Sequence, residues 1–141
     1  MDESMRRITL LSDFGMKEGY VAQMKGVMCS ITDAHLIDIS HEVSVQNVRE
    51  GAFVLWTTAP FFPVGTVHVA VVDPGVGTER KGLVITTKTQ VLVGPDNGIL
   101  LPTAHLLGEF VVYEITNPKY MIHPLSRTFH GRDIFAPVAA Y

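Results

Sequence analysis

Cysteine is nearly absent from this sequence of 141 residues, in which Cys29 is the only one. A single cysteine cannot form a disulfide within the chain, which excludes the small disulfide-stabilised secreted domains and is typical of a reducing compartment. Charged residues are also scarce, at 18% of the chain, against roughly a quarter in ordinary soluble domains. The net charge of −3 gives no sign of a nucleic-acid-binding protein, so we expect no nucleic-acid partner.

Long hydrophobic runs are absent as well. No apolar run approaches the roughly 20 residues that a membrane-spanning helix needs. The apolar run near the N-terminus stops at Ser12 and Asp13, which is too short for the core of a signal peptide. We therefore expect a cytoplasmic protein with no membrane partner.

What the sequence does contain is a series of short apolar runs, within a composition that is 47% hydrophobic. Several are continuous rather than alternating, which is typical of strands covered on both faces. The expected strands are Ile8–Leu11, Leu36–Ile39, Val67–Val72, Leu83–Thr87, Val91–Val93 and Phe110–Ile115.

Segments with helical spacing of apolar residues lie between these runs. The expected helices are Gly19–Ile31, Ser44–Thr58 with Ser44 as N-cap, Asn97–Leu107 and Asp133–Tyr141. Met24, Met28 and Trp56 have core-like spacing. Strands alternating with helices predict the α/β class, with a central, largely parallel or mixed sheet sandwiched between helices.

Acidic and amide side chains follow three of the expected strands. Asp13 follows the first, Asp73 follows the third, and Asp96 with Asn97 follows the fifth, while a fourth loop, SRTFHGRD, carries His130. Ligands of open α/β sheets bind beyond the carboxyl ends of the strands, so these loops are candidates for one site.

Ordinary structural roles are alternatives for several of these residues. Asp-Pro-Gly and Pro-Asp-Asn-Gly are common turn sequences, and Asp13 could cap the following segment. His41 could do no more than support a loop. Arg132 and Asp133 could touch substrate or only pair with each other at the start of a helix, and the structural role is favoured for both.

Other site chemistries fit the sequence less well. A metal set would combine Asp13, Asp73, Asp96, His130 and Asp133. However, the sequence has no HExxH, no paired HxH or DxD and no cysteine pair, and Arg80 and Arg132 would place positive charge nearby, so we expect no metal. Phosphate-loop and dinucleotide-binding patterns are missing, as is the GxSxG of serine hydrolases.

Asp73, Arg80 and His130 could instead act together on a water molecule. A carboxylate or an imidazole can accept a proton from water, while a guanidinium stabilises the developing hydroxide. The sequence alone does not place His130 beside Asp73.

Six motifs in order, LLSDFG, DISHEV, EGAFVL, FFPVGTVHVAVVDPGVGTER, VGPDNG and FHGRDIFAP, resemble the S-adenosylmethionine hydroxide adenosyltransferases. That family belongs with the S-adenosylmethionine-dependent fluorinase and chlorinase. The resemblance implies that residues 1–141 are an N-terminal α/β domain, and that the smaller C-terminal β-barrel domain of the family is missing from this chain. It also implies a homotrimer that binds S-adenosylmethionine between subunits.

The resemblance further implies an enzyme that converts S-adenosylmethionine and water to adenosine and methionine without a cofactor. Asp73, Arg80 and His130 would activate the water, and Asp13 would hold the ribose hydroxyls. The remaining residues expected to bind substrate are Asn97, Phe129 and Gly131.

Two other functions stay open at this point. A halogenase would use halide in place of water, but the resemblance places a tyrosine at position 73 and a serine at position 131 in the fluorinase, where this chain has Asp73 and Gly131. The other is a non-catalytic nucleoside-binding or assembly domain that lacks its second half. We expect the 141 residues alone to lack much of the substrate site.

Overall fold

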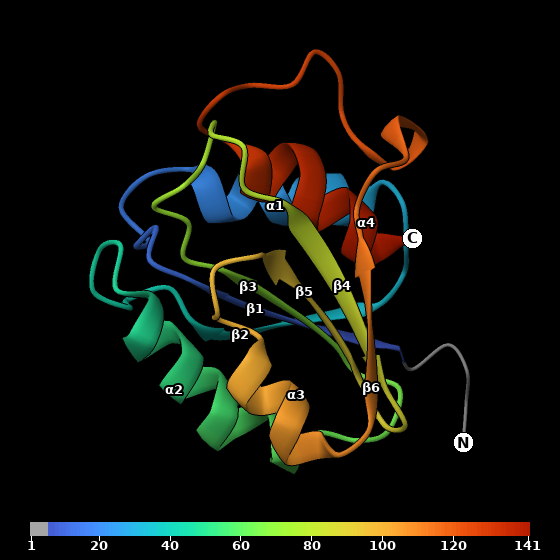
Figure 1. The fold of residues 1–141 in the computed structure, drawn as a ribbon. Helices are drawn as coiled ribbons and strands as arrows, with labels where there is room; N and C mark the ends of the chain where they lie inside the picture. The colour runs from blue at the N-terminus through green and yellow to red at the C-terminus, as the bar shows by residue number, and fades with distance from the viewer. Residues whose placement is uncertain (1–5) are drawn as a thin grey trace.

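A mixed six-stranded sheet forms the centre of the computed structural model, which describes residues 6–141 (Figure 1). The strand order is β2-β1-β3-β5-β4-β6, with β4 antiparallel to both of its neighbours and β1, β2, β3 and β5 parallel. All six predicted strands are present: β1 Arg7–Ser12, β2 His35–Ser40, β3 Val67–Val71, β4 Gly82–Thr87, β5 Val91–Pro95 and β6 Phe110–Glu114. The predicted α/β class is confirmed.

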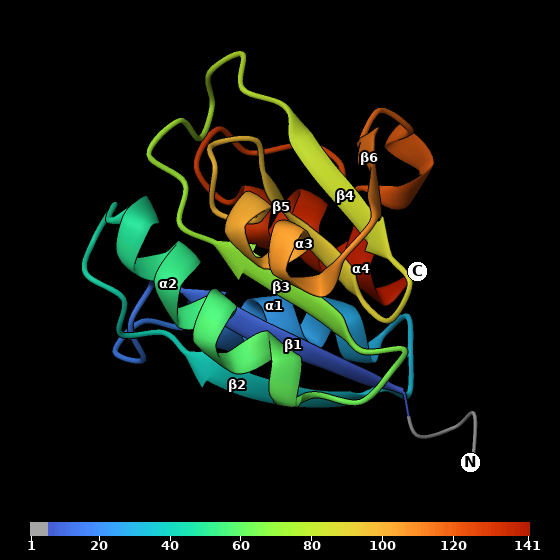
Figure 2. The ribbon, with the colours of Figure 1, turned by 60° about the horizontal axis from the view of Figure 1, so that its bottom comes forward.

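Helices cover both faces of this sheet (Figure 2). The first face carries α1 (Tyr20–Cys29) and α4 (Ala136–Ala140), and the second carries α2 (Val48–Thr58) and α3 (Leu101–Leu107). Every residue of β3 is buried, as its continuous apolar run predicts for a central strand. Short 3₁₀ turns lie at Ala59–Phe61 and Pro118–Tyr120. No helix within residues 6–141 has the length and apolarity to cross a membrane.

The second helix differs from its prediction at its start and on its outer face. Asn47, not Ser44, is the N-cap, and its side chain accepts a hydrogen bond of 3.0 Å from the Glu50 amide. The predicted N-cap was three residues early because residues 44–47 form a turn, closed by a bond from the Asn47 amide to the Ser44 carbonyl. Trp56 is 41% exposed and stacks on Phe53, so its predicted place in the core was wrong for this domain. Met24 and Met28 are buried as predicted.

The last predicted helix is divided by Pro137. A π-helical turn, Gly131–Phe135, precedes α4. Pro137 has no amide hydrogen to donate to the carbonyl of Asp133, and its ring would clash there in a regular helix. That carbonyl instead accepts a hydrogen bond from the Ile122 amide, at 2.8 Å. The irregular turn therefore ties the long 116–130 segment to the helix that follows it.

The sheet topology explains why the polar loops meet. Because β1, β3 and β5 are parallel neighbours, Asp13, Asp73 and Asp96 leave the sheet at one edge. The antiparallel β4 begins at that same edge, so the loop from β3 to β4 both leaves and returns there. The 116–130 segment arches over this edge before entering the π-helical turn (Figure 1).

Candidate active site at the carboxyl edge of the sheet

An ion pair between Asp73 and Arg80 lies at the centre of this edge. The Arg80 Nε donates to Asp73 Oδ1 at 3.0 Å and to Oδ2 at 3.1 Å, while Nη2 donates to Oδ2 at 2.5 Å. Both side chains are largely buried, with 12% of Arg80 and 5% of Asp73 exposed. Arg80 also lies against the buried ring of Phe135. A bidentate ion pair of this kind fixes the plane of the carboxylate as well as its position.

His130 completes the predicted group through Arg80. The Arg80 Nη2 also donates to His130 Nδ1, at 2.8 Å, and His130 Nε2 donates to the Ser126 carbonyl, at 2.8 Å. An imidazole that accepts at Nδ1 and donates at Nε2 is neutral, with both ring nitrogens engaged inside the protein. The structure thus brings Asp73, Arg80 and His130 together, with Arg80 in the middle.

Two glycines allow the β3–β4 loop to take this path. A Cβ on Gly75 would lie 3.1 Å from Arg80 Cγ, so a side chain there would crowd the arginine as it folds back toward Asp73. Gly77 has a φ of +79°, and a Cβ at that position would lie 2.5 Å from the Arg127 carbonyl oxygen. The loop therefore packs backbone to backbone against the segment that carries His130.

A cavity of about 220 Å³ is lined in part by Asp73. Its walls come from the loops after β1, β2 and β3 and from the 116–130 segment, and they include Asp13, Phe14, Gln46, Asp73, Thr128, Gly131 and three valines. Arg80 and His130 instead line a second cavity of about 230 Å³. Of the three predicted catalytic residues, Asp73 therefore lines the first cavity, and Arg80 and His130 line the second.

Asp13 faces the same cavity and also joins two loops. Its Oδ2 accepts a hydrogen bond of 2.7 Å from the Gln46 amide. Gln46 has a φ of +61°, a conformation that non-glycine residues seldom adopt. An ionised carboxylate has about four acceptor sites, so Asp13 retains acceptors for a ligand.

The other predicted binding residues have different surroundings. The Asn97 side chain donates to the Val72 carbonyl at 2.8 Å and accepts from the Ile99 amide at 3.2 Å, so it supports the end of β3 immediately before Asp73. Gly131 lines the cavity, and a Cβ there would lie 3.2 Å from the Phe14 ring. Phe129 packs against Tyr20, with ring centroids 4.6 Å apart, and is not among the residues that line the cavity.

The segment that carries Phe129 and His130 is held in place by Asp133. This carboxylate is fully buried, pairs with Arg132 at 2.7 Å and accepts the Ser126 amide at 2.9 Å. Burial raises the pKa of Asp133, but the hydrogen bonds from Arg132 and Ser126 outweigh it and bring the pKa below its ordinary value. Arg132 also bonds to Gln23 of α1, at 3.0 Å. The predicted pairing of Arg132 with Asp133 is confirmed.

Sequence reasoning missed six lining residues: Phe14, Val45, Gln46, Val71, Val76 and Thr128. Phe14 and Thr128 are sequence neighbours of the predicted residues Asp13 and Phe129, so they could have been predicted from the sequence. Val45 and Gln46 carry no such signal, because they enter the site through the backbone bond to Asp13. The set proposed for a metal is not assembled: within residues 6–141, no three histidine, cysteine, aspartate or glutamate side chains are placed to hold an ion.

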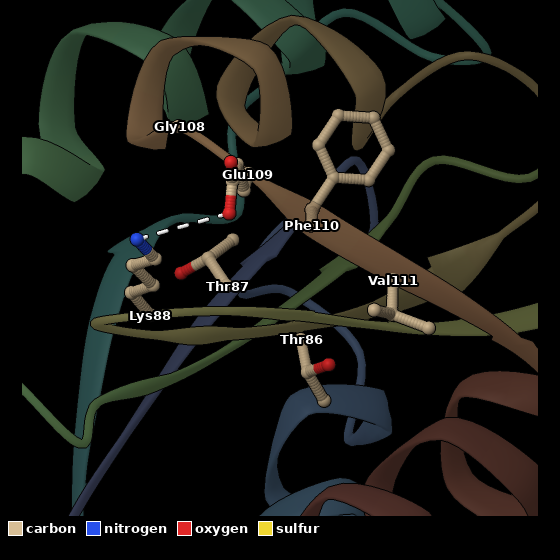
Figure 3. A pocket seen from close by; sticks show the side chains of 7 residues that line it. All are labelled: Thr86, Thr87, Lys88, Gly108, Glu109, Phe110 and Val111. Atoms are coloured by element: carbon tan, nitrogen blue, oxygen red, sulfur yellow. Dashed lines mark ion pairs between the residues drawn. The ribbon is translucent and has the colours of Figure 1, made fainter.

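A larger, open hollow of about 580 Å³ lies at the opposite end of β4 and β6 (Figure 3). Its polar feature is an ion pair of 3.7 Å between Lys88 and Glu109, both of which are mostly exposed. It contains none of the residues predicted to act in a site, and an exposed pair of this kind contributes little energy.

Comparison with known proteins decides the family. Residues 8–141 match the model of the SAM hydroxide adenosyltransferase N-terminal domain, where SAM is S-adenosylmethionine. The chain belongs to this family. Relatives named (R)-S-adenosyl-L-methionine hydrolase are 48% identical in Salinispora arenicola, over 94% of this chain and 51% of the relative, and 48% identical in Methanocaldococcus jannaschii, over 99% and 54%. A fluorinase from an Actinoplanes species is more distant, at 27% identity over 95% of this chain and 53% of the relative.

Solved structures agree with this membership of the SAM hydroxide adenosyltransferase family. An uncharacterized conserved protein from Thermotoga maritima superposes with a TM-score of 0.90 at 46% identity, covering 94% of this chain and 52% of that one. A conserved hypothetical protein from Thermus thermophilus gives 0.81 at 35% identity, covering 96% and 52%. The chain spans about half the length of the curated relatives it matches.

Proposed function

We propose that this domain is the water-activating part of an enzyme that hydrolyses S-adenosylmethionine to adenosine and methionine. The observation that carries the proposal is the Asp73 carboxylate, which Arg80 holds in a bidentate ion pair and which belongs to a residue lining the same cavity as Asp13. The relatives named as S-adenosylmethionine hydrolases are 38–48% identical, whereas those named fluorinase are 25–27% identical.

The chemistry suits such a site. A water oxygen forms a bond to the ribose C5′ while the C5′–sulfur bond breaks, and the bonding electron pair stays on sulfur as the neutral thioether of methionine. The water proton passes to Asp73. No acid is needed at the leaving group, because the sulfonium is already positively charged. The protein's work is to align the water behind C5′ and to shield it from solvent.

Each of the three central residues then has a distinct role. Asp73 touches the water and accepts its proton. Arg80 holds the Asp73 carboxylate in one plane and places positive charge next to the developing hydroxide. His130 orients Arg80 from the far side, since both of its ring nitrogens are already bonded within the protein.

Asp13 would bind the ribose. Two adjacent hydroxyls can both donate to one carboxylate. The cavity positions Asp13 and Asp73 on the walls of the same space, as binding of the ribose next to its reacting carbon requires. Gly131 would leave room for the ligand between Phe14 and Asp73, and Phe129 and Asn97 would support the walls of the cavity from outside.

The rest of the site would come from a second domain. The cavity of about 220 Å³ is small for the whole of S-adenosylmethionine, and the relatives are about twice as long as this chain. We propose that a C-terminal β-barrel domain supplies the adenine and methionine contacts, that the assembled enzyme is a homotrimer, and that it works in the cytoplasm without metal or cofactor. The lone, unpaired Cys29 supports a reducing compartment.

A chimera tests this proposal. The 141 residues would be followed by the remaining half of the Methanocaldococcus jannaschii relative, and both the chimera and the 141-residue chain would be incubated with S-adenosylmethionine, with and without chloride. We expect adenosine and methionine from the chimera, unaffected by a metal chelator. A 5′-chloro-5′-deoxyadenosine product would overturn the choice of water over halide. Binding of adenosine without turnover by a folded chimera would favour a non-catalytic nucleoside-binding domain.

A further inference from the structure

His41 lies beside the proposed ribose-binding residue, and the proposed reaction does not use it. Its side chain is buried and joins the ends of two neighbouring strands: Nδ1 lies 2.6 Å from Ser12 Oγ at the end of β1, and Nε2 lies 2.8 Å from Asp38 Oδ1 in β2. The other Asp38 oxygen accepts from Lys25 of α1, at 2.6 Å.

These hydrogen bonds form a directed chain. The Asp38 carboxylate can only accept, so His41 donates to it from Nε2, and a neutral ring then accepts the Ser12 hydroxyl at Nδ1. Partial burial raises the pKa of Asp38, but the bonds from Lys25 and His41 outweigh it and lower the pKa below its ordinary value. Ser12 is fully buried and therefore cannot attack a substrate, although the order Ser-His-Asp resembles a hydrolase triad.

This series of hydrogen bonds instead fixes the backbone on both sides of Asp13. Ser12, immediately before it, is bonded to His41, and the Phe14 amide, immediately after it, donates to Ser12 Oγ at 3.2 Å. The Gly15 amide donates to the His41 carbonyl at 2.7 Å. His41 thus holds the β1–α1 loop through both its side chain and its backbone.

The same residue begins the second loop of the cavity wall. That loop runs from His41 to Gln46, whose amide donates to Asp13 and whose φ of +61° must be held by its surroundings. The two loops are therefore hydrogen-bonded to each other at two places. One is at His41, which bonds to Ser12 and Gly15, and the other is at Asp13, which accepts from the Gln46 amide.

We infer that His41 is a positioning residue that holds the Asp13 carboxylate in place to bind a ribose diol. The inference rests on the proposed function, because it takes the diol as the ligand of Asp13. His41 acts through Ser12 and the two loops, and does not touch the substrate.

The test uses the chimera with the second half of the Methanocaldococcus jannaschii relative and two ligands, adenosine and 2′,3′-dideoxyadenosine, which lacks the 2′- and 3′-hydroxyls. Variants His41→Ala and Ser12→Ala remove the Ser12–His41 bond, whereas His41→Asn retains an acceptor near the Nδ1 position. His68→Asn is the matched control, because His68 is equally buried and hydrogen-bonded on both ring nitrogens but lies on β3 away from the cavity. The readouts are the preference for adenosine, by calorimetry, and the NMR solvent-exchange rate of the Gln46 amide.

We expect His41→Ala and Ser12→Ala to lose roughly tenfold of the preference for adenosine, with affinity for the dideoxy compound unchanged and faster exchange at Gln46. His41→Asn and His68→Asn should stay near the parent chimera. Unchanged preference and exchange in both alanine variants would overturn the inference. If the parent chimera itself shows no preference for the diol, the proposed role of Asp13 in binding ribose is wrong, and exchange at Gln46 alone decides whether His41 positions Asp13. Ser12→Ala gives the same test where His41→Ala does not fold.

Discussion

Arg80 and His130 lie fifty residues apart in the sequence and share a hydrogen bond of 2.8 Å. The same Arg80 nitrogen also bonds to Asp73, so the arginine links the loop that leaves β3 with the segment that precedes the π-helical turn. The bidentate bond from Arg80 fixes the plane of the Asp73 carboxylate. The histidine bonds to Arg80 and to the Ser126 carbonyl, and it is not among the residues that line the cavity with Asp73.

Replacing Asp73 with asparagine removes the proposed proton acceptor with little change in shape. In the chimera, we expect Asp73→Asn to slow adenosine formation by roughly 10²–10⁴-fold. Asp96→Asn is the control, because Asp96 lies at the same edge of the sheet but is exposed and outside the cavity. Equal rates in the two variants would exclude Asp73 as the base.

Replacing Arg80 with lysine keeps the positive charge but loses the bidentate hydrogen bonds to Asp73. A lysine cannot hold both Asp73 oxygens and His130 Nδ1 at once, so we expect Arg80→Lys to lower kcat by roughly 10–100-fold with a smaller change in KM. Arg49→Lys, at an exposed position on α2, should match the parent enzyme. Full activity in Arg80→Lys would show that charge alone is enough.

A side chain at Gly77 should destabilise the domain through a steric clash in addition to backbone strain. Gly65, which has a similar backbone conformation but no close neighbour, serves as the comparison. Gly77 and Gly65 both have positive φ, but a Cβ at Gly77 would lie 2.5 Å from the Arg127 carbonyl oxygen, whereas nothing lies within 4 Å at Gly65. We expect Gly65→Ala to cost about 1 kcal/mol of unfolding free energy from strain alone, and Gly77→Ala about 1–3 kcal/mol more. Denaturant unfolding measures both, and equal losses would mean that the contact with Arg127 is unimportant.

The buried His68 should make the domain sensitive to mild acid. Its ring lies between the Thr9 hydroxyl, at 2.6 Å, and the Gln90 side chain, at 2.7 Å, and burial lowers its pKa from 6.5 to about 4. Because the unfolded chain binds the proton more tightly, the full stability is present above about pH 6.5 and falls as the pH drops toward 4, by about 3 kcal/mol in all.

Urea unfolding near neutral pH and at about pH 5 measures this effect. His68→Gln removes the titrating ring, so the variant should be less stable than the parent near neutral pH but should lose less stability on acidification. If the parent and the variant lose the same amount, His68 is not responsible for the acid sensitivity.

The fold was largely predictable from the sequence, because the strands are continuous apolar runs separated by turn residues. β3 is the clearest case, with every residue buried. Trp56 shows the limit of periodicity, since helical spacing does not state which face of α2 meets the sheet. The start of α2 was predicted too early because the bond between Asp13 and Gln46 holds the preceding loop in another conformation.

The site was predictable in part. Asp73 and Arg80 lie in the same loop, between β3 and β4, so their proximity needs only local reasoning. The contact with His130 depends on how the 116–130 segment crosses the sheet edge, which is set by Gly77 against Arg127 and by Asp133 bonding Ser126. The family resemblance named His130, but only the three-dimensional arrangement places it behind Arg80 and outside the cavity. Asn97 was expected to bind substrate, and its bond to the carbonyl of Val72 is a contact that the sequence did not predict.

Attack of water at C5′ is the central claim, and isotope labelling tests it most directly. The chimera would turn over S-adenosylmethionine in ¹⁸O-labelled water, and the adenosine would be examined by mass spectrometry. We predict one ¹⁸O atom in the 5′-hydroxyl, formed in the presence of chloride as well as in its absence and strongly slowed by Asp73→Asn. A halogenated nucleoside in chloride, or labelled adenosine formed equally fast by Asp73→Asn, would contradict the account.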